Sequence, residues 1–219
     1  MSNLDFASVL ANWQVFVDGA AITVLMTVIA TIFGLVLGIA CGWSRAQGPL
    51  WLRIIVSCYV ELTRNTPYII QLFFIFFGLP AIGIRMSALN ASIISLIINL
   101  GAYACEIVRS GIQSTPKGQV EAAQSLALNN WQIFTRVVLP PALSRVWDAI
   151  IGQVIIIMLG SAVCSQISTA ELSFQANLLA SQNFHNFESY IVATVIYLFL
   201  AVVVRQIFRW IGPRFIFAR

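Results

Sequence analysis

The sequence predicts an all-α integral membrane protein with five transmembrane helices. Of its 219 residues, 59% are hydrophobic and only 9% are charged, and the mean hydropathy is +0.89. A soluble domain carries about 25% charged residues. The apolar residues form long continuous runs rather than the short alternating segments of a membrane β-barrel, so the predicted spans are helices.

The first expected element is a helix over residues 3–17 that lies in the membrane interface. Its apolar residues fall at helical spacing, with Trp13 as an interfacial anchor. Long, nearly charge-free stretches follow it, and about 20 residues of helix cross a 30 Å hydrocarbon core. The predicted spans are at about residues 19–44, 65–84, 86–108, 142–166 and 187–208.

Residues 50–66 are apolar but contain Arg53, Glu61 and Arg64. Each charge would cost about 2.5–3.5 kcal/mol at the bilayer centre. The segment is therefore expected at the cytoplasmic interface or as a projecting extension of the second span, with Pro67 kinking or restarting the helix. Two ion pairs are expected at i, i+3 spacing, namely Glu61 with Arg64 and Glu106 with Arg109.

The basic residues predict the orientation. With five spans and an inside C-terminus, Arg85 alone among the twelve Lys and Arg residues lies outside. Basic residues favour the cytoplasmic side, so the prediction is N-out and C-in. The +4 net charge is thereby explained by topology, and no nucleic-acid partner is expected.

A polar loop over residues 115–141 is predicted to be cytoplasmic and folded. Thr115 is a candidate N-cap with Pro116 at the first helical position, and residues 119–128 favour a helix. The Asn129-Asn130 pair indicates a turn, and a second short helix over 131–138 is expected to end at Pro140 and Pro141. A membrane protein that folds such a loop is expected to present it to a partner.

The outer loop 168–188 is expected to contain a short helix at about 169–182, capped by Thr169. His185 is the only histidine, and the four cysteines are scattered in or beside apolar segments without metal-like spacing. Without repeats or linkers, the chain is predicted to be one domain, 1–219.

The sequence contains no phosphate-binding loop, dinucleotide motif or metal-binding motif, so neither a bound cofactor nor a metal is expected. No charged residue falls centrally in a span, where an ion-coupled transporter usually has one. Among the polar residues of the spans, Asn99, Gln153 and Ser161, with Gln71, are candidates for a solute pathway. This pattern favours a translocation subunit whose energy is supplied by another protein. It disfavours a channel, a secondary transporter or a membrane-embedded enzyme.

The polar loop resembles the EAA loop of the permease subunits of ABC-type importers. Glu121-Ala122-Ala123, a small residue at 127, an aliphatic residue at 137 and Leu139-Pro140 match that motif at every spacing. Ala127 stands for the usual Gly and Val137 for Ile. Residues 59–80 and 101–120 resemble the polar amino acid class (histidine, glutamine, glutamate, opine), and the likeness extends over nearly the whole chain.

The resemblance implies a MetI-like, type I importer permease in a bacterial inner membrane. Its partners would be a second identical or paralogous permease, a cytoplasmic ATPase dimer that binds ATP and Mg, a periplasmic or lipid-anchored solute-binding protein, and membrane lipid. Val120, Ala123 and Ala127 are expected to form a small apolar stripe that docks on the ATPase, beside Glu121. The residues assigned to ATPase coupling are Lys117, Gly118, Glu121, Ala122, Ala123, Ala127, Leu139 and Pro140.

One departure from the resemblance concerns the solute. Where the class often has Lys-Asp-Thr-Ser, this chain has Leu159, Gly160, Ser161 and Ala162. We therefore expect that no charged substrate group is held there, and Gly160 and Ser161 join the candidate pathway. The subunit would either be the partner half of a heterodimer or handle a different solute, such as an opine or a compatible solute.

Overall fold

The computed structural model describes residues 6–216, and within them the regular structure is entirely helical. Four helical stretches are long and apolar enough to cross a membrane, and a bent pair would make a fifth span. The four are α2 (Trp13–Gln47), α5 (Ala88–Gln113), the run Asn130–Ile167 and the run Asn186–Arg214. The third comprises α7 (Asn130–Gln132), η3 (Ile133–Val138), α8 (Leu139–Gly160) and η4 (Ser161–Ile167), and the fourth begins with α10 (Asn186–Ile211) and enters η5 (Gly212–Ile216).

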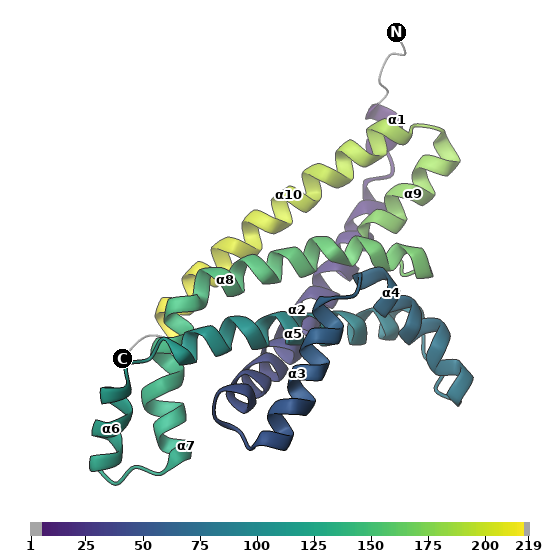
Figure 1. Cartoon of the computed structure of the whole chain (residues 1–219). Helices are drawn as coiled ribbons and strands as arrows, with labels where there is room; N and C mark the ends of the chain where they lie inside the picture. The colour runs from purple at the N-terminus through teal and green to yellow at the C-terminus, as the bar shows by residue number, and fades with distance from the viewer. Residues whose placement is uncertain (1–5, 217–219) are drawn as a thin grey trace.

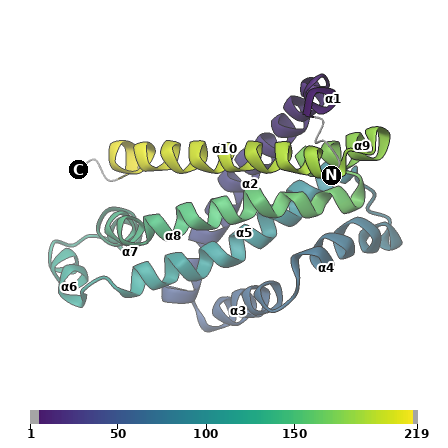
Figure 2. The same cartoon turned by 90° about the horizontal axis from the view of Figure 1, so that it is seen from above.

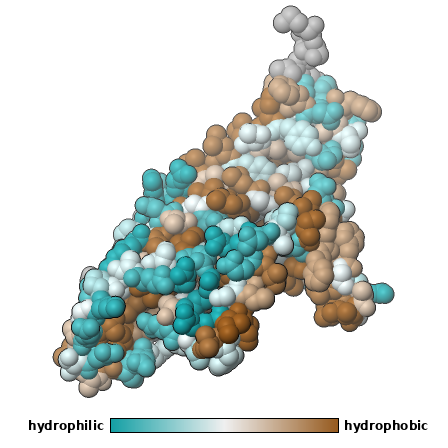
Figure 3. All heavy atoms as spheres, viewed as in Figure 1, coloured by the Kyte–Doolittle hydropathy of each residue, from teal (hydrophilic) through white to brown (hydrophobic). Residues whose placement is uncertain are grey.

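The long helices separate two ends of the molecule. In Figures 1 and 2 the hairpin of α6 (Lys117–Ser125) and α7 lies at the same end as the C-terminus, and α9 (Leu172–Asn183) lies at the end of the N-terminus. In the face drawn in Figure 3, hydrophilic residues predominate around the hairpin and hydrophobic residues over α4. The predicted cytoplasmic loop thus projects from one end of the bundle.

The predicted interface helix over 3–17 is wrong in its extent and in its single apolar face. Residues 3–5 lie outside the described part of the chain, α1 covers only Phe6–Leu10, and Trp13 already begins α2. Val9 and Phe16 are buried against α9, whereas Trp13 is exposed. Leu10 and Val17 are exposed like Trp13, so the apolar residues of this segment divide between a buried side and an exposed side.

The second predicted span, 65–84, is shorter and sharply bent. Helix α3 (Leu50–Arg64) meets the run Tyr68–Ile82 at 110°. That run comprises α4 (Tyr68–Phe73), η1 (Phe74–Gly78) and η2 (Leu79–Ile82), and at 1.5 Å per residue it would extend about 22 Å. Pro67 caps α4 and restarts the helix as expected, because it has no N–H to continue the bonding of α3.

Close packing of α2 on α5 forms the centre of the fold. Gly34, Gly38 and Gly42 are spaced four residues apart on α2 and meet α5 at every turn. A Cβ on Gly34 would lie 2.9 Å from Leu100 Cβ, and one on Gly38 would collide with Ala104 Cβ. Small residues at this spacing let two membrane helices approach closely.

A charged cluster ties the hairpin ends of α2, α3 and α5. The Glu106 carboxylate pairs with Arg45 and, at 2.8 Å, with Arg109, which confirms the expected i, i+3 pair. Arg64 lies 4.0 Å from the same carboxylate and stacks on the Tyr103 ring. The expected Glu61–Arg64 pair is wrong, because Arg64 turns toward α5 and Glu61 accepts from Asn65 Nδ2.

At the opposite end, Glu171 fastens α9 to the bundle. Its buried carboxylate caps α9 by accepting from the Phe174 N–H at 2.7 Å and accepts the Tyr197 hydroxyl of α10 at 2.6 Å. Burial raises the pKa of this carboxyl. Thr169 was expected to be the cap, but its hydroxyl instead contacts Ser92 Oγ of α5 at 2.8 Å.

Candidate coupling site

The hairpin begins one residue later than predicted. Pro116, with φ −59° and ψ 134°, is the N-cap of α6, and Lys117 is its first helical residue. Thr115 does not cap the helix, because its hydroxyl lies 3.4 Å from the Arg145 guanidinium of α8. Arg145 also donates to Ser114 Oγ at 3.1 Å. The entry to the hairpin is therefore tied to α8.

Helix α6 ends in a Schellman turn with Ala127 in the left-handed conformation, at φ 56°. The Leu128 N–H donates to Ala123 O and the Ala127 N–H donates to Gln124 O, which are the two bonds that define this turn. Leu128 packs in the same apolar cluster as Ala123. The chain thus keeps the backbone bend for which the motif has glycine, although alanine is strained there.

Ala127→Gly should therefore stabilise the hairpin. Relief of the left-handed strain, offset by glycine's larger unfolded-state entropy, is expected to be worth about 0.5–1 kcal/mol. Hydrogen exchange of the amides at 126–128 should slow by about two- to fivefold, since 1.4 kcal/mol corresponds to tenfold. As a control, Ala122→Gly inside α6 should speed exchange. Faster exchange in Ala127→Gly would contradict the assigned turn.

The second half of the hairpin runs directly into α8. Asn129 and Gln132 form a capping box that starts α7. The expected stop at Pro140 and Pro141 is wrong, because π-helical turns over Ile133–Val138 precede the prolines and the helix continues through them. The Leu139 N–H donates five residues back to Phe134 O, and such a widened turn accommodates rings without an N–H.

Helix α6 has three distinct faces. Ala123, 5% exposed, and Val120 pack into the protein's own apolar cluster with η3. Lys117, Glu121 and Gln124 line a crevice toward α2 and α5. Gly118, Ala122 and Leu126, spaced four residues apart, form the outward face. Of the residues expected to form the docking stripe, Ala123 is covered by its own chain, Val120 is half-buried and Ala127 is exposed. Docking on an ATPase stays a prediction.

The largest side chain of the outward face, Leu126, is apolar. Leu126 is 76% exposed, and the neighbouring Trp131 of α7 is 66% exposed. Trp131 is supported from behind, because its ring centroid lies 6.1 Å from that of Phe134, which in turn is 6.0 Å from Trp43 of α2. Large apolar side chains that gather on an exposed surface are typical of sites where another protein binds. Neither Leu126 nor Trp131 was selected from the sequence.

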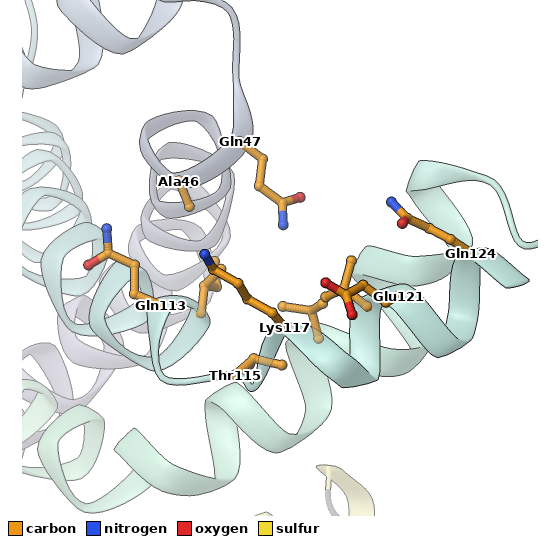
Figure 4. Close-up of a pocket in the computed structure, with 10 residues that line it drawn as sticks. Ala46, Gln47, Gln113, Thr115, Lys117, Glu121 and Gln124 are labelled. Atoms are coloured by element: carbon orange, nitrogen blue, oxygen red, sulfur yellow. The ribbon is translucent and has the colours of Figure 1, made fainter.

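The crevice behind α6 has a volume of about 370 Å³. Figure 4 shows Lys117 and Glu121 entering it from α6, with Gln47 of α2 and Gln113 of α5 on the other side. Its base is apolar and includes Ile112, Val120 and Val138. Two of the predicted coupling residues, Lys117 and Glu121, thus line this crevice, and Leu139 and Pro140 are half-buried at the start of α8.

The candidate pathway residues divide into two groups. Asn99 of α5 donates to Gln71 Oε1 of α4 at 3.0 Å. Gln71 also donates to Thr63 O and Thr66 O across the bend at Pro67, and it borders a mainly apolar cavity of about 470 Å³. The sequence predicted both residues but not their contact, which depends on the bend.

The remaining candidates lie on α8 and η4. Ser161 is fully buried and donates its hydroxyl to Met158 O at 2.6 Å, within its own helix. Gln153 and Gly160 are half-buried, and space is open around Gly160. Tyr68, which the sequence did not single out, links α4 to α5 and η4, because its hydroxyl contacts Ser95 Oγ at 2.8 Å and Cys164 Sγ at 3.2 Å.

A bundle of apolar helices with a folded hairpin at one end, and polar side chains meeting at a break within the bundle, defines a membrane transport subunit. Residues 34–217 match the family model described as binding-protein-dependent transport system inner membrane component. The chain belongs to this family of ABC importer permeases.

Individual relatives cover nearly the whole chain. The glutamine transport system permease protein of Escherichia coli is 30% identical over 212 residues, which are 96% of this chain and 97% of that protein. A crystal structure of an amino acid ABC transporter with histidines superposes with a TM-score of 0.86 at 30% identity, over 97% of this chain and 99% of that one. The MetNI methionine ABC transporter shares the fold, with a TM-score of 0.78 at 23% identity over 91% and 95% of the two chains.

Proposed function

We propose that this chain is the translocation subunit of an ATP-driven importer for polar amino acids, with glutamine as the first solute to test. The single observation that carries the coupling role is the outward face of α6, where Ala122 and Leu126 are exposed on a rigid hairpin. The solute class follows from the names of the relatives, a glutamine permease and an amino acid transporter.

In this proposal the chain itself is not catalytic. A cytoplasmic ATPase dimer binds ATP and Mg and receives the hairpins of two permease subunits, identical or paralogous. A periplasmic or lipid-anchored binding protein delivers the solute at the end that carries α9. Closure of the ATPase dimer moves the hairpins, and because α7 continues through η3 into α8, that motion enters the bundle along one continuous helix.

The solute crosses between helices near the break at Pro67. Gln71 and Asn99 there can exchange their mutual hydrogen bond for bonds to a carboxamide or a zwitterion. Ser161 serves packing in this view, since its hydroxyl is already satisfied. An uncharged pathway agrees with the absence of the Lys-Asp pair at positions 159 and 160.

Reconstitution in liposomes tests the proposal. The chain with its ATPase, binding protein and any second permease subunit should accumulate labelled glutamine only when ATP is enclosed with the ATPase, and an ATPase unable to hydrolyse ATP should abolish uptake. Uptake by the permease chain alone, without ATPase, would instead support an autonomous channel or secondary transporter and overturn the proposal.

A further inference from the structure

Helix α10 lies at the edge of the bundle, beside α8, and its C-terminal end is at the same end as the hairpin (Figure 2). Only 6% of its most apolar window of 18 residues is buried within the described part of the chain. Near its C-terminal end it packs on Trp147 of α8, whose Nε1–H donates to Phe208 O at 3.1 Å. A Cβ on Gly212 would collide with the same indole ring. The rest of this helix end is open to its surroundings.

A groove of about 560 Å³ lies along the open side of this helix end. It is lined by Val203, Gln206, Ile207, Trp210 and Ile211. These positions recur every three or four residues, so they share one face of α10, and at 1.5 Å per residue the groove follows the helix for about 12 Å. All of them except Gln206 are apolar, which suits a hydrocarbon chain better than a polar solute.

Three arginines lie along the groove and at its C-terminal end. The guanidinium carbon of Arg214 is 5.1 Å from the centroid of the Trp210 ring, in a cation–π contact. Arg205 and Arg209 lie one turn apart on the neighbouring face of α10. All three side chains are exposed, and none forms an ion pair with another residue that the structure describes. Their positive charge is therefore available to a partner.

Cytoplasmic topology explains why these residues are basic, but it does not explain why they flank a groove. The sequence has no acidic residue from 189 to 219 that could neutralise them. Like charges four residues apart on a helix, as at Arg205 and Arg209, are destabilising unless a counter-charge lies nearby. Basic clusters at the cytoplasmic end of a span attract anionic lipids. Such a lipid fits both features, because its acyl chain is apolar and its phosphate accepts hydrogen bonds from guanidinium groups.

We propose that this groove binds one anionic phospholipid from the leaflet on the hairpin side. An acyl chain lies along the apolar residues of the groove, and the phosphate accepts from Arg209 and Arg214. Trp210 lies at the level of the headgroup, where tryptophan is enriched in membrane proteins. The bound lipid holds the end of α10 beside Trp147 and thereby stabilises the end of the bundle from which the hairpin projects. This site goes beyond the proposed function and needs neither an ATPase nor a solute.

Native mass spectrometry of the full chain, purified in detergent, tests the proposal. The protein is mixed with equal amounts of dioleoyl phosphatidylglycerol and dioleoyl phosphatidylcholine, which share their acyl chains and differ in headgroup charge. Two arginines at about fivefold each should make the anionic lipid bind about 25-fold more tightly. Arg209→Gln and Arg214→Gln should each lower this preference about fivefold, whereas Arg214→Lys keeps the charge and should retain it. Arg136→Gln removes an exposed charge from the hairpin and is the matched control, with an unchanged preference.

Each alternative occupant has its own outcome. Equal binding of the two lipids, or an unchanged preference in both glutamine variants, would overturn the site. Glycerophosphoglycerol, which is the headgroup without acyl chains, should not compete, and competition by it would indicate a site for a free phosphate ester instead. If the arginine substitutions separated two permease subunits without changing lipid binding, the groove would be a protein interface and the lipid assignment would be wrong. Loss of ATP-driven uptake with intact lipid preference would count against the proposed function and leave the lipid site standing.

Discussion

Gly38→Leu is expected to prevent the chain from reaching its folded, monodisperse state. Even a single methyl group on Gly38 would collide with Ala104 Cβ and lie 3.1 Å from the Ala104 carbonyl carbon, so neither side chain nor backbone can yield. Overpacking by one or two methylenes typically costs about 1–3 kcal/mol, and leucine adds four carbons at the closest approach of α2 and α5. The measurement is the yield and thermal unfolding temperature of the purified protein in detergent.

Three further variants, one of them a double substitution, make this result specific. Gly152→Leu on α8 has no atom within 4 Å of the added Cβ and should leave the unfolding temperature close to that of the parent. Gly38→Ala should destabilise the protein by about 1–3 kcal/mol, and Ala104→Gly in the same chain should recover part of the loss by removing the colliding methyl. If the two substitutions were simply additive, the proposed contact between these positions would be wrong.

The bounds of a span were predictable where charged residues alone set its two ends. Asp18 and Arg45 bound the first apolar run, and α2 covers that run with short extensions at both ends. The second run, 65–84, also lacks charge, but its first three residues are not helical. Helix α3 ends at Arg64, and α4 begins only after Pro67. Hydropathy does not detect this break, and it was Pro67 that predicted a kink or restart there, although not the 110° angle. The glycines of α2 were visible at four-residue spacing, and that pattern could have identified the α5 contact.

The hairpin was predictable from motif spacing, whereas the face that it presents was not. Small apolar residues suit a cleft on a partner and the inside of a tight turn equally well. Only the path of η3 decides between them, because it covers Ala123 and leaves Ala122 outside. The sequence therefore located the hairpin, whereas the structure was needed to show that Ala123 faces inward and Ala122 outward.

Leu126→Asp is expected to disconnect the permease from its ATPase under the proposed function. The side chain is 76% exposed at the tip of the outward face, so the substitution removes a large apolar contact and buries a charge in the joint surface without disturbing the protein's own core. Hot-spot residues of interfaces are worth about 2–4 kcal/mol, which corresponds to about a 30-fold or greater loss of affinity. Co-purification of the ATPase and ATP-driven uptake in liposomes should both be lost.

Gln124→Asp is the matched control, because it adds the same charge two residues earlier on the face toward the crevice. ATPase binding should be retained in this variant, since the outward face of Gly118, Ala122 and Leu126 is unchanged. The reverse order, with Gln124→Asp losing the ATPase and Leu126→Asp keeping it, would show that α6 docks through the face of Lys117 and Glu121. The two variants thus decide which face of the nine-residue helix α6 contacts the ATPase.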